Sequence, residues 1–485
     1  MYDAVSFVKR LPLMLKPDAS RVLIRPFMMD GEARIQRIIA RVMMLAESEV
    51  EAMLAKVVGD FEDRHHELRH MLSRRFTEIR RYLYTDGDIS DVRKMLIASY
   101  FTMEYSIESA ALFNPSIVAH PDQSGADEGG IRFILSLRAT GEGHLSSITF
   151  RDGFIGPDGG VRIIPPTRFV TEPEYVGVKI YNKGLFRRKL REIGCENDVS
   201  DLVLKPLPEQ FYLVDLKRQI DAVQRETGSL RKDIHTTAMS MVGLAESNYE
   251  VQFGESSISE RIIFPNSPSQ RRGIEDARFV RFADDDGTVT YYATYTAYDG
   301  SITLPQILET RDFLHFTFST LNGPAVRNKG MALFPRRING MYTMLARQDN
   351  EHIFLMYSDN IHFWYDPKVI IKPTFPWEYV QMGNCGSPIE LEEGWLVLTH
   401  GVGPMRQYCI GALLLDRNDP SKVRARLAEP LIRPVGTERD GYVPNVAYTC
   451  GALLSGDTLI IPYAISDYAT GFASVNVHSL LEAMR

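Results

Sequence analysis

The chain has 485 residues, of which 44% are hydrophobic and 24% charged, and it carries a net charge of -7. This composition is that of a globular protein with a sizeable core, and it excludes a disordered or fibrous chain. Because there is no excess of positive charge to hold a polyanion, we expect no nucleic-acid partner. No apolar run reaches the roughly 18 residues of a membrane helix, and charges and prolines interrupt residues 1–17 where a secretory signal would be apolar. We therefore expect a cytoplasmic protein with no membrane partner.

The first part of the chain has helical periodicity. From Ile35 to Leu83 apolar residues recur at three- and four-residue steps, and a further helical stretch extends to about Leu112. A short strand is expected at residues 22–24. We predict that residues 1–112 form a helical N-terminal region, and its long amphipathic stripe suggests a homo-oligomer interface.

The segment His66–His70 in this region matches the H-E-x-x-H zinc signature, in which two imidazoles share one helical face. The surrounding arginines, among them Arg64, Arg69 and Arg74, oppose a divalent cation, and no third ligand follows. We interpret the segment as a solvated helix surface and expect no metal site. The four cysteines lie far apart without a C-x-x-C pair, so we expect reduced, structural thiols.

After Phe113 the pattern changes to short β-type runs separated by Gly, Asp and Asn, which is typical of a sandwich, barrel or propeller. Similar units recur, the later ones at a period of about 50 to 60 residues, which suits propeller blades. The units open at Asn114-Pro115, Glu275-Asp276, Phe334-Pro335, Ser387-Pro388 and Val443-Pro444. The sequence therefore predicts a mainly β fold, a five-bladed propeller over residues 113–485.

The long gap between the first two units predicts an insertion at about residues 154–270. An apolar stripe from about Leu213 to Met241 predicts a helix within it, whose basic residues we interpret as a solvated face.

Two adjacent carboxylates, Glu275 and Asp276, stand among three arginines just before an apolar strand. Strand alternation would send them to opposite sides, so that one faces a cleft while the other pairs with an arginine. Such an arrangement can hold one carboxyl protonated and the other ionised, as acid–base catalysis requires. A structural salt-bridge corner explains the same residues, and local chemistry leaves both readings open.

A second set of polar residues, all beside predicted strand ends or turns, would converge in the centre of a propeller and could bind an anion such as phosphate. The set comprises Lys329, Arg336, Arg347, His400 and Arg406. Ordinary scattered surface charge is the alternative. Aromatic residues that could stack on sugar rings, although most such residues are packing residues, are Tyr295, Tyr298, Trp364, Trp377 and Tyr408.

In several further motifs the chain resembles glycoside hydrolase family 130, the inverting β-mannoside phosphorylases and β-mannosidases built on a five-bladed propeller. The resemblance covers about residues 113–485, and its motifs are Gly273–Arg278, Tyr295–Gly300, Ala332–Pro335 with Asn339-Gly340, Thr399–Val402, Gly411–Asp416 and Gly441–Val446.

The resemblance implies that Asp276 is the general acid, acting through a hydroxyl of the bound mannose. It implies an oligosaccharide substrate, no cofactor and, if the enzyme is a phosphorylase, inorganic phosphate as co-substrate. The implied sugar-binding residues are Asn114, Arg138, Glu275, Arg278, Tyr298, Asp299 and Asp467, and the implied phosphate-binding residues are Lys329, Arg347 and His400.

The chain departs from the family pattern at Ala277, at Gln381, where many phosphorylases have a lysine, and in the segment Tyr463–Asp467. An inverting hydrolase needs a second carboxylate roughly 6.5 to 9.5 Å from the acid, for which Glu390 or Glu438 would serve. A phosphorylase needs only cations near the sugar. We predict phosphorolysis releasing α-mannose 1-phosphate, with hydrolysis as the alternative. A non-catalytic glycan-binding propeller is a third reading, disfavoured because binding needs no proton donor.

Overall fold

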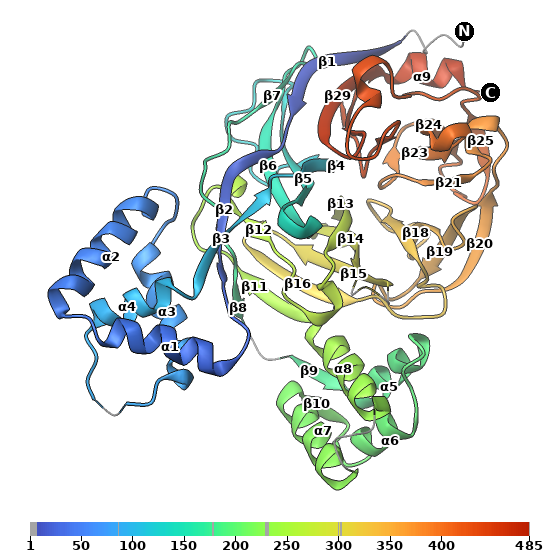
Figure 1. The fold of residues 1–485 in the computed structure, drawn as a ribbon. Coiled ribbons are helices and arrows are strands. Elements are labelled where there is room, and N and C mark those ends of the chain that lie inside the picture. The colour runs from blue at the N-terminus through green and yellow to red at the C-terminus, as the bar shows by residue number, and fades with distance from the viewer. Residues whose placement is uncertain are drawn as a thin grey trace.

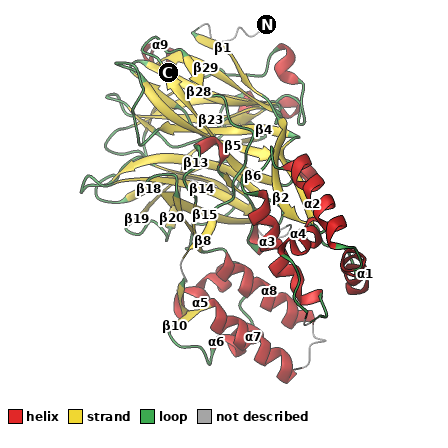
Figure 2. Ribbon diagram, turned by 90° about the vertical axis from the view of Figure 1, so that its left-hand side faces the viewer, coloured by secondary structure: helices red, strands yellow, loops and turns green. Residues whose placement is uncertain are grey.

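The computed structural model describes residues 7–85, 87–176, 179–227, 232–298, 300 and 303–484. The protein is mainly β, and its larger sheets are antiparallel. Five sheets of four to six strands lie around a common centre, and two groups of helices lie outside them (Figures 1 and 2).

We number the five sheets in chain order by the strand nearest the centre. Sheet 1 contains β4 (Ala111–Ala119), β5 (Ile131–Thr140), β6 (Ser146–Ile155), β7 (Val161–Ile163) and β12 (Ile262–Ile263). Sheet 2 contains β13 (Ile274–Ala283), β14 (Val289–Tyr298), β15 (Thr303–Thr310), β16 (His315–Thr320), β11 (Tyr249–Gln252) and β8 (Glu174–Val176). Sheet 3 contains β17 (Lys329–Leu333), β18 (Tyr342–Arg347), β19 (Ile353–Ser358) and β20 (Tyr365–Ile371).

The last two sheets complete the ring. Sheet 4 contains β21 (Gln381–Asn384), β22 (Ile389–Glu390), β23 (Trp395–Val402), β24 (Tyr408–Leu415) and β25 (Val423–Arg426). Sheet 5 contains β26 (Ala447–Tyr448), β27 (Leu453–Ser455), β28 (Thr458–Ile465), β29 (Ala469–Asn476) and β1 (Val8–Leu15). A short helix, α9 (Val477–Ala483), follows sheet 5.

Each sheet contacts the next, and the last contacts the first through β28 and β4. Each of the five units predicted from the sequence contributes to one sheet. Sheet 5 joins the two ends of the chain, because β1 pairs with β29, with Val8 opposite Val475. This pairing ties the N-terminal strand into the last sheet.

Middle strands of the sheets are buried on both faces, so their sequences are apolar runs and do not alternate. In β23 all eight residues are buried, including Trp395. The faces of neighbouring sheets pack on one another: Val280 of sheet 2 and Met331 of sheet 3 share one core cluster with Trp364. Apolar burial between the sheets therefore positions the inner strands.

The first group of helices lies between β2 (Asp18–Pro26) and β3 (Thr102–Glu108), which pair with each other. The helices are α1 (Glu32–Met43), α2 (Glu47–Phe61), α3 (Leu68–Ile79) and α4 (Asp91–Ser99). The predicted helical region therefore contains three strands as well, and the strand expected at residues 22–24 lies within β2. The H-E-x-x-H segment is helical only in its second half, because α3 begins at Leu68 after Glu67 in a left-handed conformation with φ 53°. The expectation of one continuous helical face is therefore wrong for His66 and Glu67.

The second group of helices lies within the predicted insertion and has its own hydrophobic core. It contains α5 (Lys183–Glu192), α6 (Asp198–Leu204), α7 (Leu213–Thr227) and α8 (Lys232–Glu246) with the hairpin β9 (Ile180–Asn182) and β10 (Gln210–Tyr212). The single helix predicted from Leu213 to Met241 is two helices, and residues 228–231 between them lie outside the described residues. Within the described ranges, no helix is long and apolar enough to cross a membrane.

Candidate active site

The inner strands of three sheets are interrupted at similar positions. The pairing register shifts between Phe113 and Ser116 in β4, between Glu275 and Arg278 in β13, and between Lys329 and Ala332 in β17. Residues within the first two bulges are left-handed, with φ 47° for Asn114 and φ 53° for Asp276. That conformation is unfavourable for most non-glycine residues, although Asn and Asp tolerate it best, and it is found often at functional sites.

Asp276 lies at the centre of this arrangement and is 7% exposed. The side-chain amide of Asn114 donates to its Oδ1 over 2.6 Å, and guanidinium nitrogens of Arg138 and Arg278 lie 3.6 and 3.7 Å from its oxygens. Burial raises the pKa of this carboxyl, but the charges of Arg278, Arg138 and Lys329 and the Asn114 hydrogen bond outweigh burial and lower it. Asp276 is therefore ionised in the free protein at neutral pH.

Glu275 contacts the same cations. Its carboxylate accepts from Arg138 over 3.0 Å and from Lys329 over 3.5 Å. The expectation that Glu275 and Asp276 point to opposite sides is wrong, because the bulge between Glu275 and Arg278 breaks the alternation and both carboxylates contact Arg138. Two carboxylates thus share one guanidinium.

Arg278 links three sheets beneath Asp276 and is 1% exposed. Its Nε donates to the carbonyl of Cys385 over 2.6 Å, its Nη1 to the carbonyl of Asp276 over 2.9 Å, and its Nη2 to the hydroxyl of Tyr448 over 2.6 Å. Charge-assisted bonds of this kind are strong and geometrically specific. They hold Arg278 under the Asp276 backbone.

Asp467 follows β28 and is also left-handed, with φ 52°. Burial raises the pKa of its carboxyl to about 6; Arg138 and Arg406 oppose this rise, while Asp276 and Glu275 add to it. Asp467 therefore shares the charge of Arg138 with the Asp276 carboxyl. Asp467 is the carboxyl whose pKa is raised at this site, whereas that of Asp276 is lowered.

The three residues predicted to bind phosphate are brought together on sheets 3 and 4. Lys329 and Arg347 are cross-strand partners, and Nη1 of Arg347 lies 3.1 Å from Nε2 of His400. Burial, Arg347 and Arg278 lower the pKa of His400 well below its usual value, so its imidazole is neutral and Nε2 accepts the hydrogen bond.

Two glycines allow this close packing. A Cβ on Gly383 would lie 2.6 Å from Cε1 of His400 and 2.7 Å from Cδ of Arg347, and a Cβ on Gly330 would lie 2.6 Å from Cγ of Arg347. Real Cβ atoms do not approach other atoms so closely. The Arg347–His400 pair therefore depends on glycine at both positions.

Other predicted residues lie elsewhere or are engaged. Tyr298 donates its hydroxyl to the Gly300 carbonyl over 2.9 Å, and Asp299 lies outside the described residues. Arg336 does not belong to the cation cluster predicted from the sequence, because it pairs with Glu390 at 2.6 Å. Gln381 begins β21 opposite Val402 and is half-buried.

Both glutamates predicted as alternative bases are held by cations. Glu390 contacts Arg336 and Arg417, with shortest distances of 2.6 and 3.2 Å, and Arg336 lowers the pKa of its carboxyl. Glu438 lies 2.7 Å from Nε of Arg10 and also accepts from the hydroxyl of Tyr463. Among the described residues, no hydrogen bond or ion pair joins either glutamate to Asp276.

Sequence reasoning missed several residues of this site. Asn384 donates to the carbonyl of Gly330 over 2.8 Å, so it links sheets 4 and 3, and Cys385 and Tyr448 hold Arg278. Asn384 lies at the end of the inner strand β21, and Asn114 lies in the bulge of the inner strand β4. Comparison of the repeated units could have revealed this similarity of position.

Comparisons with known proteins identify the family of the chain. The family model of glycoside hydrolase family 130, described as beta-1,4-mannooligosaccharide phosphorylase, matches residues 214–485, more than half of the chain. The chain is 34% identical over 250 residues to a 1,2-beta-oligomannan phosphorylase of Thermoanaerobacter sp. (strain X514), covering 50% of this chain and 80% of that protein. It is 28% identical over 323 residues to a beta-1,2-mannobiose phosphorylase of Listeria innocua, covering 64% of this chain and 83% of that protein.

Among solved structures, the chain is similar to the beta-1,2-mannobiose phosphorylase from Listeria innocua in complex with beta-1,2-mannobiose. The sequence identity is 20%, the TM-score is 0.46, and the match covers 78% of this chain and 92% of that one.

Proposed function

The chain belongs to glycoside hydrolase family 130, and from this membership we propose that it cleaves β-1,2-mannosidic bonds with inorganic phosphate and releases α-mannose 1-phosphate. Three relatives at 28 to 34% identity carry names of phosphorylases acting on β-1,2-linked mannose. These names support both the β-1,2 linkage and the choice of phosphate over water.

We further propose that the five sheets are the blades of a propeller. Their contacts run from each sheet to the next and from the last back to the first, and β1 joins the C-terminal strand β29. A propeller brings the inner strands of successive blades to one central funnel, which accounts for the convergence of residues from β4, β13, β17 and β23.

The observation that carries the proposed function is the grouping of Lys329, Arg347 and His400 near an acidic side chain. The charge of Lys329 acts on Asp276, and those of Arg347 and Arg278 act on His400. Such a group suits a phosphate dianion, because guanidinium and ammonium groups bind phosphate oxygens strongly. Nε of Arg347 has no hydrogen-bond partner among the described residues, as expected of a donor kept for a ligand.

In the proposed reaction the bond between the anomeric carbon and the leaving oxygen breaks, and a phosphate oxygen bonds to that carbon from the opposite face. Asp276 supplies a proton to the leaving oxygen through a hydroxyl of the bound mannose. The hydrogen phosphate dianion loses its proton on becoming an ester, which restores the proton of Asp276. Charge and protons therefore balance without a cofactor.

The lowered pKa of Asp276 gives phosphate a second role. In the free protein the surrounding cations keep this carboxyl ionised. A bound phosphate dianion offsets their charge, so it raises the pKa of Asp276 and allows the proton to be held. We propose that Asp276 becomes a competent acid only when phosphate and sugar are both bound.

Sugar positioning falls to Asn114, Arg138, Glu275 and Asp467 in this proposal. Asn114 Oδ1 is buried without a partner among the described residues, and the two carboxylates can accept hydroxyl hydrogen bonds. Arg278 acts through Asp276, which it positions from below. Contacts of Tyr298 and Asp299 with sugar stay predictions, as do a cytoplasmic location, a homo-oligomer through the helical region, and the domain boundary at residue 112.

Product analysis with β-1,2-mannobiose, with and without inorganic phosphate, tests the proposed function. We expect mannose 1-phosphate and free mannose in equal amounts when phosphate is present, and no cleavage without it. Release of two mannose molecules per mannobiose without phosphate would show that water is the nucleophile and would overturn the proposal.

A further inference from the structure

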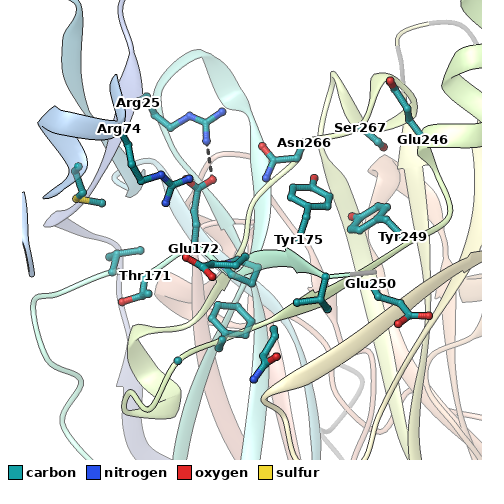
Figure 3. A pocket seen from close by; sticks show the side chains of 18 of the residues that line it. Arg25, Arg74, Thr171, Glu172, Tyr175, Glu246, Tyr249, Glu250, Asn266 and Ser267 are labelled. Atoms are coloured by element: carbon teal, nitrogen blue, oxygen red, sulfur yellow. Dashed lines mark hydrogen bonds and ion pairs between the residues drawn. The ribbon is translucent and has the colours of Figure 1, made fainter. Parts of the chain in front are cut away.

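A cavity of about 1410 Å³ lies between the two groups of helices and the outer edge of sheet 2 (Figure 3). Its lining comes from α3 of the first group, from residues 170–176 including β8, from β11, from the end of α8, and from residues 266 and 267. No residue of the Asp276 site belongs to this lining. We call this cavity the lateral groove.

Two tyrosines form an aromatic surface in the lateral groove. Tyr175 on β8 is 57% exposed, and its ring centroid lies 5.4 Å from that of Tyr249 on β11. The Tyr249 ring is fixed from behind, because it stacks on Phe318 at 4.4 Å and its hydroxyl accepts from Gln270 over 3.1 Å. An exposed ring on a rigid support suits the C–H face of a sugar, since aromatic side chains combine a large apolar face with a polar edge.

Hydrogen-bonding groups surround these rings. Arg25 Nη1 lies 2.6 Å from Oε1 of Glu172, with Arg74 beside this pair, and Asn266 lies next to Tyr175 (Figure 3). The Tyr175 hydroxyl can both donate and accept a hydrogen bond. Alternating donors and acceptors beside an aromatic face are what vicinal hydroxyl groups require.

The charges of the lateral groove disfavour a phosphorylated or otherwise anionic ligand. Its lining has three lysine and arginine side chains, Arg25, Arg74 and Lys179, and three histidines, against five glutamates. Glu172 already pairs with Arg25, so the charge of this arginine is balanced within the groove. A neutral, polyhydroxylated ligand fits a lining of both signs without a cationic excess.

The size of the lateral groove points to an extended ligand. Pockets for single small molecules measure about 300–1,000 Å³, and this cavity of about 1410 Å³ is larger. It exists because α3 and residues 170–176 are added to the edge of sheet 2, outside the inner strands that carry Asp276. Several sugar residues of a chain could lie along it.

We propose that the lateral groove is a second, non-catalytic binding site for neutral oligosaccharide, and that it holds β-1,2-linked mannose chains on the Tyr175 ring. The identity of the sugar rests on the proposed function, whereas the class of ligand rests on the groove itself. The groove would keep long chains on the enzyme between cleavage events.

Calorimetric titration of the full-length protein with β-1,2-mannohexaose in phosphate-free buffer tests this proposal, because the proposed reaction cannot proceed without phosphate. We expect two sites per chain in the wild type and one in Tyr175→Ala. Tyr84, 78% exposed on the helical N-terminal region and outside the groove lining, offers the matched control, and Tyr84→Ala should keep both sites. Glu172→Gln preserves the shape of the side chain and serves as a second groove variant in case Tyr175→Ala does not fold. It should weaken the same site at least severalfold.

A single site in the wild type, or two sites retained in both groove variants, would overturn the groove proposal. Phosphorolysis measured in parallel separates the two claims. If the wild type is active but has one binding site, only the groove proposal is refuted. If the wild type is inactive but has two sites, one of which is lost in Tyr175→Ala, the groove proposal is supported and the proposed reaction is refuted.

Discussion

The centre of the ring and the lateral groove handle charge in opposite ways. At the centre, Asp276, Arg278 and His400 are buried, and their contacts cross from sheet to sheet. In the groove, Tyr175 and the Arg25–Glu172 pair are partly exposed, and the ion pair joins β2 to the segment that precedes β8 at the edge of the ring. Charge stabilisation in a reaction needs prepositioned groups in a water-poor site, whereas sugar binding needs only a shaped, hydrated surface.

The backbone separates the two regions in the same way. Asn114, Asp276 and Asp467 all adopt left-handed conformations, whereas Glu172, Tyr175 and Tyr249 do not. Strain is maintained only where the surrounding packing enforces it. The comparison therefore predicts that substitutions at the centre affect turnover or folding strongly, while those in the groove affect binding of long chains.

Removal of the proposed acid should have the largest effect. Asp276→Asn keeps the size of the side chain and its position beside Asn114 but cannot supply a proton, so kcat should fall about 10²–10⁴-fold, the contribution of a general acid. Steady-state kinetics with β-1,2-mannobiose and calorimetric binding of the sugar check this. Full activity in Asp276→Asn would remove the acid assignment.

Loss of one phosphate-binding cation should come next. Arg347→Met keeps an apolar chain between Gly330 and Gly383 but deletes the guanidinium, and we expect kcat/KM for phosphate to fall about 10²–10³-fold. Arg336→Met is the matched control, because Arg336 pairs with Glu390 away from this cluster. An equal loss in both variants would contradict a specific role for Arg347.

The raised pKa of Asp467 predicts a pH dependence. A protonated carboxyl accepts hydroxyl hydrogen bonds poorly, so sugar affinity should fall as pH decreases through about 6, by up to about tenfold per pH unit. Asp467→Asn should abolish this dependence while lowering affinity. Because the folded-state pKa is raised, the ionised carboxylate destabilises the free fold above a pH of about 6, and Asp467→Asn should raise Tm there.

A substitution that crowds the Arg347–His400 pair should have the smallest effect. Gly383→Ala places a Cβ 2.6 Å from His400, and overpacking of this kind costs about 1–3 kcal/mol of unfolding free energy. Gly59→Ala, within α2 and with open space around its Cβ position, should instead be neutral or stabilising by up to about 1 kcal/mol. Thermal unfolding of both variants measures the difference, and equal Tm values would contradict the packing argument.

Much of the ring could be predicted because it repeats. The five units beginning with Asn114-Pro115 each supply strands to one sheet, and short apolar runs separated by turns identify strands locally. The pairing of β1 with β29 could not be predicted, because it joins residues at opposite ends of the chain and Val8–Leu15 precedes a long helical stretch.

The sequence pointed to charged residues that the structure brings together, but not to their geometry. Asp276 and Lys329 stand in clusters of charged residues, and the family resemblance added Arg138. Strand alternation gave the wrong direction for Glu275 because no sequence signal marks the bulge. The bulge is seen only in the structure, as a shift of the pairing register and as the left-handed backbone of Asp276. Tyr448 and Cys385 act through a hydroxyl and a backbone carbonyl on Arg278, contacts that arise only after the sheets pack. The lateral groove, assembled from several segments that are far apart in the chain, was likewise not predictable from the sequence.

The most direct test of the account is a phosphorus and proton NMR time course of the wild-type enzyme with β-1,2-mannobiose and inorganic phosphate. The account predicts that each bond cleaved consumes one phosphate and yields mannose 1-phosphate that is wholly the α-anomer from the earliest time points. Formation of the β-anomer, or release of mannose with no loss of phosphate, would contradict it.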